Sequence, residues 1–490
     1  MHYQKNKRKK RAQLVFIYTL MVISVFAIVS VLVMVVLGYR FNRYDGKVEQ
    51  GGLVQFDSRP TGATVTIDGI TLASKTTSKI TASTGKHTVT IAKPGYQPWQ
   101  KQVTVLPGSV LWLNYALLLQ QNAPERTLLT VPALTSSVVS PDYRYLAFVA
   151  EASSPVIHVV SLNSDTPQVD KVTIPSSILT VSSDPGARSQ FSVQSWDKDG
   201  RHVLVRHTYS DTGSELLSVP LRGGDAPYNV TRSLGVTIDR ADYALDDSNT
   251  VIVLTNTHEI REANIANNTL SGPLITNVAD FSYCERSTIC YTTLPSASGV
   301  RLAGYYSRGA SVPRTVRTST SSTTTPVQPL AVTTGKYFGE HYIVTVDGDT
   351  MTIQKGTIPA SDTGKLTLVT VATVPLHMSG GQPQFSPDDS RFIMVQAGEK
   401  IVVYDLELLQ VSRITLPAAP ALPVQWIDNH HWAAVVNGIA TYYDFDGTNA
   451  AAFHAQAAAQ SVALSENKKY LYAFYNSAAG VQLVRVTRAN

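Results

Sequence analysis

The stretch that decides the fold is Ser137–Ala150, SVVSPDYRYLAFVA, in which an apolar run, a polar turn and a second apolar run follow one another. Proline presets φ in the turn, and the aspartate after it can hydrogen-bond to its own backbone, so the segment predicts a β-hairpin. Two further copies are PQFSPDDSRFIMVQ at Pro383–Gln396 and SVALSENKKYLYAF at Ser461–Phe474. A hairpin that recurs along the chain indicates a repeat architecture.

Weaker copies of this hairpin lie between the three clear ones, and a third strand pattern follows most of them. The turns are centred on Ser140, Ser195, Leu245, Cys284, Phe338, Ser386, Ile427 and Ser465. Their mean spacing is about 46 residues, within the range of roughly 40–50 that is typical of β-propeller blades with four strands each. We predict an all-β protein with an eight-bladed propeller over residues 125–490. Seven blades are the alternative, because the copy around Phe338 is the poorest.

Residues 125–130 (ERTLLT) precede the first copy and form an additional strand pattern. We expect this strand to complete the last blade, because closing the ring removes an open sheet edge. An array of two-sheet sandwiches is the alternative, but it leaves the strand unexplained. The Ser-Pro-Asp turns at 140–142 and 386–388 resemble the repeats of Tol-type periplasmic propellers. The Gly-His…Trp-Asp signature of WD repeats is absent, so only a WD-like repeat is inferred.

A smaller β-domain is predicted over residues 51–120, where alternating apolar residues are interrupted by turn signals such as Asp68-Gly69. Its opening, FDSRPTGATVTIDG at 56–69, and its second half, TGKHTVTI at 84–91 followed by a Pro-Gly-Tyr turn, resemble a PEGA domain. Such domains are small β-folds of bacterial and archaeal envelope proteins, usually beside another module, without known catalytic residues. The resemblance therefore implies a surface protein and no particular reaction.

Residues 14–37 contain no charge and no proline, and a helix of this length spans roughly 36 Å, enough to cross a membrane. The preceding stub, residues 1–13, carries six cations and no acid, whereas the following linker, residues 38–50, carries three cations and two acids. This asymmetry predicts a single-pass protein of the cell membrane with a cytoplasmic N-terminus and an extracytoplasmic bulk. A cleaved signal is the alternative, but its apolar region would have about 7–15 residues.

The net charge of +5 is misleading, because the basic stub supplies all of it and the remainder is close to neutral. Such a body has no strong field to attract phosphate backbones, so we expect no nucleic-acid partner. Thr315–Thr325 (TVRTSTSSTTT) is of low complexity, and we expect an exposed loop there.

The chain has two cysteines, Cys284 and Cys290, which flank a predicted hairpin turn. Residues placed symmetrically about such a turn face one another, so we predict a disulfide in an oxidising compartment; two buried thiols are the alternative. In the smaller domain, Trp112 and Leu118 lie on the face of the last strand opposite its apolar side. We predict that these two residues contact the propeller.

Three turns rich in aspartate, at 197–200, 347–349 and 444–447, lack the further oxygen ligands of a calcium loop. We interpret them as plain hairpin turns. His202 and His207 are five residues apart, so on one strand they would point to opposite faces. We therefore predict no metal site, no cofactor and no catalytic residues from sequence alone.

The favoured function is a non-enzymatic binding or scaffold protein of the cell envelope, with a protein or glycan docked on the loop face of the propeller. One alternative is an enzyme whose catalytic cluster, contributed by several blades, faces the channel and acts on envelope glycan or peptide. Another is a structural spacer. Convergent charged side chains at the channel mouth would favour the enzyme, and a channel lined by Ser, Thr and apolar residues would favour binding. The oligomeric state and the ligand are left open.

Overall fold

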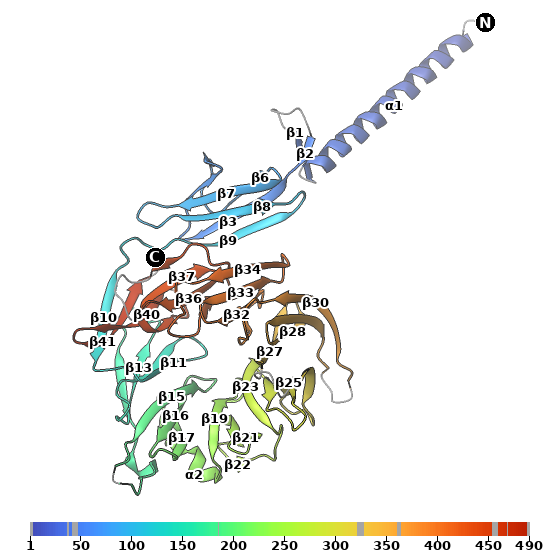
Figure 1. Ribbon diagram of the computed structural model, residues 1–490. Helices are drawn as coiled ribbons and strands as arrows, with labels where there is room; N and C mark the ends of the chain where they lie inside the picture. The colour runs from blue at the N-terminus through green and yellow to red at the C-terminus, as the bar shows by residue number, and fades with distance from the viewer. Residues whose placement is uncertain are drawn as a thin grey trace. The chain divides into compact units, whose positions relative to one another are not determined.

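The computed structural model describes residues 3–36, 39–41, 48–184, 186–320, 328–359, 364–452, 459–467 and 469–487. The chain forms two compact units that divide between Asn122 and Ala123 (Figure 1). Each unit is described by itself.

The first unit begins with one long helix, α1 (Tyr3–Val36), whose part Gln13–Val36 is long and apolar enough to cross a membrane. Leu37, the last residue of the predicted span, lies outside the described residues. The linker after it contains a short antiparallel ribbon of β1 (Tyr39–Phe41) and β2 (Val48–Gln50).

The small β-domain consists of two sheets that share one core. Its three-stranded sheet pairs β3 (Gly52–Arg59) with β6 (Ser78–Ala82) on one side and, in parallel, with β9 (Val110–Leu117) on the other. The second sheet has the order β5 (Ile70–Thr71), β4 (Thr64–Ile67), β7 (Gly85–Ala92), β8 (Trp99–Val105). Side chains from both sheets form the core, among them Phe56, Val65, Ile91, Trp99 and Leu113. Alternating apolar residues therefore face inward, as the sequence predicts.

Within its described residues, the second unit contains eight four-stranded antiparallel sheets arranged in a ring, which define an eight-bladed propeller (Figure 1). The first strands of the blades are innermost, and several neighbouring ones contact one another, such as β11 with β15 and β23 with β27. Blades 1 to 4 are formed by β11 (Ser136–Val139), β12 (Tyr145–Val149), β13 (Val156–Ser161), β14 (Val169–Thr173); β15 (Gln190–Trp196), β16 (His202–Thr208), β17 (Ser214–Pro220), β18 (Tyr228–Asn229); β19 (Ile238–Tyr243), β20 (Thr250–Thr255), β21 (Ile260–Asn264), β22 (Thr269–Leu270); and β23 (Val278–Glu285), β24 (Thr288–Thr293), β25 (Val300–Ser307), β26 (Arg314–Thr320).

The remaining blades follow the same plan, and eight is the predicted number. Blades 5 to 8 are formed by β27 (Leu330–Tyr337), β28 (Glu340–Asp347), β29 (Thr350–Thr357), β30 (Thr367–Pro375); β31 (Gln384–Phe385), β32 (Phe392–Ala397), β33 (Lys400–Asp405), β34 (Gln410–Thr415); β35 (Gln425–Asp428), β36 (His431–Val436), β37 (Ile439–Asp444), β38 (Ala451–Ala452); and β39 (Ala459–Leu464), β40 (Tyr470–Ser477), β41 (Gly480–Thr487), β10 (Glu125–Val131). Two short helical elements, η1 (Ser176–Ile178) and α2 (Val230–Leu234), lie after the outer strands of blades 1 and 2.

The outermost strand of blade 8 comes from the other end of this unit's sequence. Strand β10 pairs antiparallel with β41, with Glu125 opposite Val486 and Val131 opposite Val481. A shared core joins blade 8 to blade 1, because Phe148 packs against Phe474 with ring centroids 5.0 Å apart. Strand β10 thereby covers the edge that β41 would otherwise leave open.

The repeated serine of the hairpin turns has a structural role that explains its recurrence. Ser140, Ser386 and Ser465 are each 1 % exposed. The backbone N–H that opens the next strand donates to the serine Oγ in each case, from Tyr145 (2.9 Å), Phe392 (3.1 Å) and Tyr470 (2.9 Å). A buried hydroxyl thus satisfies a backbone donor at the start of the second strand.

The expectation of a loop at Thr315–Thr325 is wrong over its first half. Residues up to Thr320 belong to β26, the outermost strand of blade 4, and pair with β25. Threonine is β-branched and favours strands, and an outer strand tolerates polar side chains that face water. The rest of that stretch, 321–325, lies outside the described residues.

Candidate functional site

A cavity of about 460 Å³ opens in the channel of the propeller, at the end of the innermost strands of blades 1, 6, 7 and 8. It lies where these strands pass into the first turn of their blades. No residue in its lining is charged. Its lining includes three aromatic side chains and two amide side chains, those of Tyr143, Phe385, Trp426, Gln384 and Gln425. We refer to this cavity as the channel pocket.

Tyr143 reaches the channel pocket from the Ser-Pro-Asp turn of blade 1. Its φ is +57°, a conformation that non-glycine residues rarely adopt. Two backbone hydrogen bonds hold it there: Tyr143 N–H donates to Ser140 O (2.9 Å), and Glu466 N–H donates to Tyr143 O (3.0 Å). The side chain is still 43 % exposed. The turn therefore presents a fixed aromatic ring to the pocket at the cost of local strain, which is common at binding sites.

The protonation state of Tyr143 follows from its surroundings. Burial of the hydroxyl raises its pKa, and the nearby Asp388 carboxylate adds to the effect. The phenol therefore stays neutral at physiological pH and can both donate and accept a hydrogen bond.

Trp426 and Phe385 supply the other rings. The Trp426 ring lies 6.1 Å from that of Phe392, with an angle of 24° between their planes, and both pocket rings are half-buried. The amides of Gln384 and Gln425 offer donors and acceptors beside them. Aromatic faces next to uncharged hydrogen-bonding groups suit a ligand with both apolar faces and hydroxyl groups.

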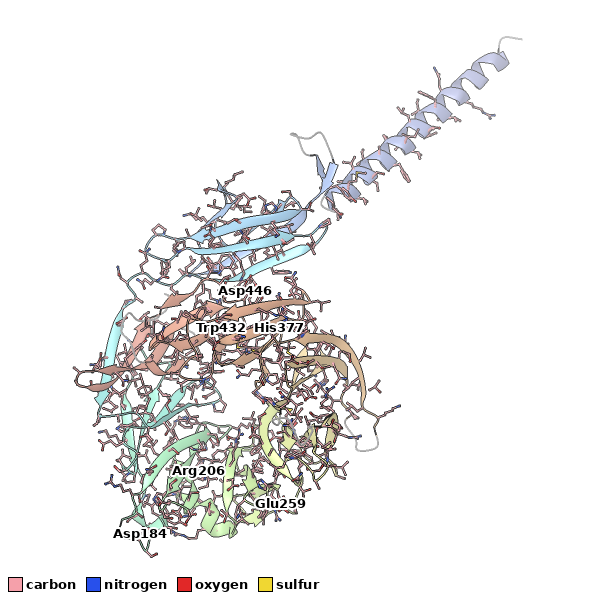
Figure 2. The ribbon with its side chains drawn as sticks, in the orientation of Figure 1. Asp184, Arg206, Glu259, His377, Trp432 and Asp446 are labelled. Atoms are coloured by element: carbon pink, nitrogen blue, oxygen red, sulfur yellow. A yellow bond between two sulfur atoms is a disulfide. The ribbon has the colours of Figure 1, made fainter. Side chains whose placement is uncertain are left out.

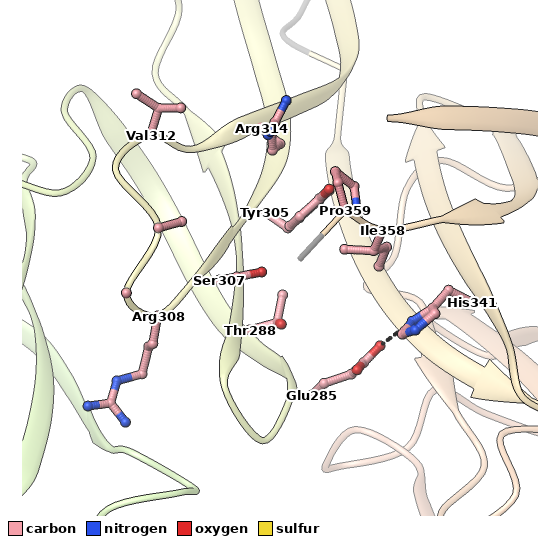
Figure 3. A pocket seen from close by; sticks show the side chains of 12 residues that line it. Glu285, Thr288, Tyr305, Ser307, Arg308, Val312, Arg314, His341, Ile358 and Pro359 are labelled. Atoms are coloured by element: carbon pink, nitrogen blue, oxygen red, sulfur yellow. Dashed lines mark ion pairs between the residues drawn. The ribbon is translucent and has the colours of Figure 1, made fainter. Parts of the chain in front are cut away.

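A second cavity, of about 430 Å³, lies between blades 4 and 5 (Figure 3). Unlike the channel pocket it is partly charged: His341 Nδ1 is 3.4 Å from Glu285 Oε1, and Arg314 also lines it. Tyr305 is 2 % exposed, and its hydroxyl has no hydrogen-bond partner among the residues that the structure describes. Arg308 points away from this cavity in Figure 3 and forms ion pairs with Asp246 and Glu262.

Several charged groups elsewhere on the propeller pair within their own blades. Arg391 binds Asp405, His431 binds Asp428 (2.6 Å), and His202 lies 3.0 Å from Asp197. Asp197 accepts hydrogen bonds from the backbone N–H groups of Arg201 and His202, as a plain turn residue does. In the part of the chain that the structure describes, no group of three or more His, Cys, Asp or Glu side chains could hold a metal ion.

The structure pairs Cys284 with Cys290, whose Cα atoms are 5.8 Å apart. The two cysteines are not directly opposite each other in the hairpin. Cys290 stands opposite Ser282, and Cys284 lies in a β-bulge between Tyr283 and Glu285. The bulge turns Cys284 toward its partner.

Trp112 and Leu118 have different surroundings within the first unit. Trp112 lies on the outward side of β9 and is 45 % exposed, whereas Leu118 is fully buried in the core of the small β-domain. A bulge between Phe56 and Ser58 shifts the register between β3 and β9. The predicted contact of these residues with the propeller stays a proposal.

Comparison with known proteins supports the domain description. The PEGA domain family matches residues 52–121. No curated protein matches the chain.

Three solved structures that match part of this chain are distant from it in sequence. The C-terminal WD40 domain of Sif2 is 11 % identical, with a TM-score of 0.47, over 75 % of this chain and 99 % of that one. Sqt1 from Saccharomyces cerevisiae is 12 % identical, with a TM-score of 0.47, over the same shares of the two chains. A prolyl endopeptidase is 13 % identical, with a TM-score of 0.41, over 69 % of this chain and 58 % of that one. From its own helix and sheets and from the family match, the protein combines a candidate membrane-spanning helix, a PEGA domain and an eight-bladed propeller.

Proposed function

We propose that this protein is a membrane-anchored binding protein of the cell envelope whose channel pocket takes up an uncharged glycan segment. The observation that carries the proposal is the lining of the pocket: three aromatic rings, two amide side chains and no charge. A sugar ring has apolar C–H faces that can stack on aromatic rings and hydroxyl groups that can bond with amides. A catalytic cluster at this mouth would need convergent acid, base or cationic side chains, and the lining has none.

The binding unit lies outside the cytoplasm in this proposal. Six cations precede the apolar segment Gln13–Val36 and none of the first 13 residues is acidic, which favours a cytoplasmic N-terminus. The PEGA match at residues 52–121 supports the same placement, because such domains belong to surface proteins. Protease added to intact cells should remove the propeller, whereas digestion only after lysis would contradict this orientation.

Binding is tested with the full chain purified in detergent, using soluble oligosaccharides released from cell-envelope glycan as the probe. Tyr143→Ala and Gln425→Ala should each raise the Kd about tenfold, the loss expected for one stacking or hydrogen-bonding contact of about 1.4 kcal/mol. The matched control is Phe338→Ala, because Phe338 is an aromatic residue in the first turn of blade 5 that is 85 % exposed and not part of the pocket. Its Kd should equal that of the wild type.

Two outcomes would count against the proposal. Wild-type protein that binds none of the oligosaccharides would favour the structural spacer. Binding that Phe338→Ala weakens as much as Tyr143→Ala would place the ligand outside the channel pocket.

A further inference from the structure

Ser189, His207 and Glu215 form a hydrogen-bonded chain on blade 2, far from the channel pocket in sequence and independent of the binding function. His207 Nε2 lies 3.1 Å from Ser189 Oγ, and His207 Nδ1 lies 2.8 Å from Glu215 Oε1. The three residues stand just before β15, near the end of β16 and near the start of β17. A hydroxyl, an imidazole and a carboxylate in this order and at these distances are the arrangement that activates a serine nucleophile.

Glu215 is held as an ionised, fixed acceptor. It is 3 % exposed and accepts hydrogen bonds from Thr180 N–H (2.8 Å), Thr180 Oγ1 (2.5 Å) and Asn229 Nδ2 (2.7 Å). Burial raises the pKa of this carboxyl, but the hydrogen bonds from Thr180, His207 and Asn229 outweigh burial and lower it. An ionised Glu215 keeps the imidazole proton on Nδ1, which leaves the lone pair of Nε2 free to accept the Ser189 proton.

His207 itself has one fixed orientation. It is 1 % exposed, and its ring stacks on Phe191 with centroids 4.6 Å apart and an angle of 8° between the planes. Ser189, in contrast, is exposed. Asp184 lies at the outer edge of the propeller (Figure 2), and Ser189 directly precedes β15, the first strand of blade 2. The buried His207 imidazole is thus within hydrogen-bonding distance of a serine hydroxyl that is accessible to solutes.

Three other histidine–carboxylate pairs of this protein differ from this arrangement at the second ring nitrogen. His202 has Asp197 at one ring nitrogen and Asp225 at the other (3.2 Å). His431 has Asp428 at Nδ1 (2.6 Å) and Asp444 at Nε2 (3.5 Å). His87 has Asp68 at Nδ1 (2.6 Å), but its Nε2 lies closer to the Ser83 carbonyl oxygen (2.8 Å) than to the Ser83 hydroxyl (3.4 Å). Of these four pairs, only that of His207 has a serine hydroxyl as the nearest partner of its second nitrogen.

We propose that Ser189 is a nucleophile for acyl transfer from carboxylic esters, with His207 as its general base and Glu215 as the positioning residue. Ser189 Oγ forms a bond to the ester carbonyl carbon while its proton passes to His207 Nε2. The bond from that carbon to the alkoxide oxygen then breaks, and the alcohol leaves with the proton from His207. Water then attacks the acyl carbon and gives a proton to His207. The bond from that carbon to Ser189 Oγ breaks as Oγ takes the proton back from His207, which restores Ser189 and releases a carboxylic acid.

The experiment uses the full chain in detergent with a fluorophosphonate probe, which forms a stable bond to an activated serine, and with 4-nitrophenyl acetate as an ester. Trypsin cleaves after Arg188 and Lys198, so the adduct should appear on the peptide 189–198 and fragment to Ser189. Ser189→Ala should abolish both labelling and ester hydrolysis. Ser183→Ala, which changes an exposed serine of the same segment, should leave both unchanged.

The contribution of Glu215 is measured by the rate of labelling. Glu215→Gln should slow it by a factor of at least about 10, and Glu215→Asp should restore part of the rate because it keeps a carboxylate. Thermal unfolding of each variant confirms that it is folded. Wild-type labelling no faster than that of Ser189→Ala, or an adduct confined to Ser192 or Ser195 of the same peptide, overturns the proposal. Glycan binding at the channel pocket is unaffected by either result.

Discussion

Arg144 and Glu466 are joined by two hydrogen bonds although 322 residues separate them: Nε to Oε2 at 2.9 Å and Nη2 to Oε1 at 3.2 Å. They belong to the first turns of blade 1 and blade 8, and Asn163 donates to the same carboxylate at 2.7 Å. Both side chains are well exposed, so the pair contributes little energy. It marks the junction at which the ring closes, and β10 completes the adjoining sheet.

The first prediction concerns β10. Of two soluble fragments, 123–490 should be monomeric and fold cooperatively, whereas 132–490 should aggregate, because it exposes the edge of β41. Size-exclusion chromatography and thermal unfolding measure both properties. Equal melting temperatures for the two fragments would show that β10 does not stabilise the ring.

The second prediction concerns the buried ion pair of blade 6. Arg391 binds Asp405 through two hydrogen bonds, of 3.1 Å from Nε and 2.7 Å from Nη2. Arg391→Met leaves a buried carboxylate without its counter-charge and should lower the free energy of unfolding by about 3 kcal/mol. Arg413→Met, at an exposed position of the outer strand in the same blade, should cost less than about 0.5 kcal/mol. Similar losses for both variants in chemical denaturation would argue against the assigned role.

The third prediction is a pH dependence caused by His430. Burial, with a smaller effect from the neighbouring His431, lowers the pKa of His430 to about 4. In the unfolded chain its pKa is about 6.5. At a pH between about 4 and about 6.5, His430 is therefore protonated in the unfolded state and mostly neutral in the folded state. Stability should therefore fall as the pH decreases from about 6.5 to about 4, by on the order of 3 kcal/mol from this residue.

The test for His430 compares the wild type with His430→Gln at pH 7.5 and pH 4.5. Asp428 and Asp405 oppose the shift and Arg391 supports it, and all three are kept in the variant. The difference in unfolding free energy between the two pH values should be smaller in His430→Gln. An unchanged difference would mean that other groups cause the acid sensitivity.

The fourth prediction concerns the cysteines. Protein denatured without reductant should contain no free thiol, and the double variant Cys284→Ser, Cys290→Ser should lose about 2 kcal/mol or less, because the closed loop is short. Thiol titration and chemical denaturation give these values. Two free thiols in protein isolated from the envelope would favour the reduced alternative.

The fifth prediction is that Trp112 mediates contact between the PEGA domain and the propeller. Trp112→Ala should then accelerate limited proteolysis in the linker 121–124. Leu106→Ala, which removes another exposed apolar side chain of the same unit, is the control. Identical cleavage rates in wild type and Trp112→Ala would exclude this role.

The propeller could be predicted because its turn chemistry is local. The serine of each clear copy accepts a hydrogen bond from the N–H that opens the next strand, as Ser140 does from Tyr145. Both residues of such a bond lie within six residues of each other, so the pattern can be recognised in a short stretch of sequence. The spacing of these turns then gives the number of blades, even where the copy at Phe338 is poor. The PEGA motif and the apolar helix are local signals for the same reason.

The bulges and the chemical sites could not be predicted, because they depend on contacts between distant residues. Cys284 faces Cys290 only because a bulge breaks the symmetry of the hairpin. Strict alternation of side chains along the strand would place Leu118 on the same face as Trp112. The register shift between β3 and β9 turns Leu118 to the other face, where it is buried in the core.

The amino-acid sequence by itself determined the helix, the PEGA domain and the ring of eight blades, since each follows from periodicity or turn chemistry within a short window. Only the tertiary structure decided which side chains meet. Tyr143 and Trp426 share a pocket because ring closure brings blade 1 beside blades 7 and 8. Ser189 meets His207 because a long connection returns to the innermost strand of its own blade. Strand pairing fixes these distances across the fold, and no spacing along the chain encodes them.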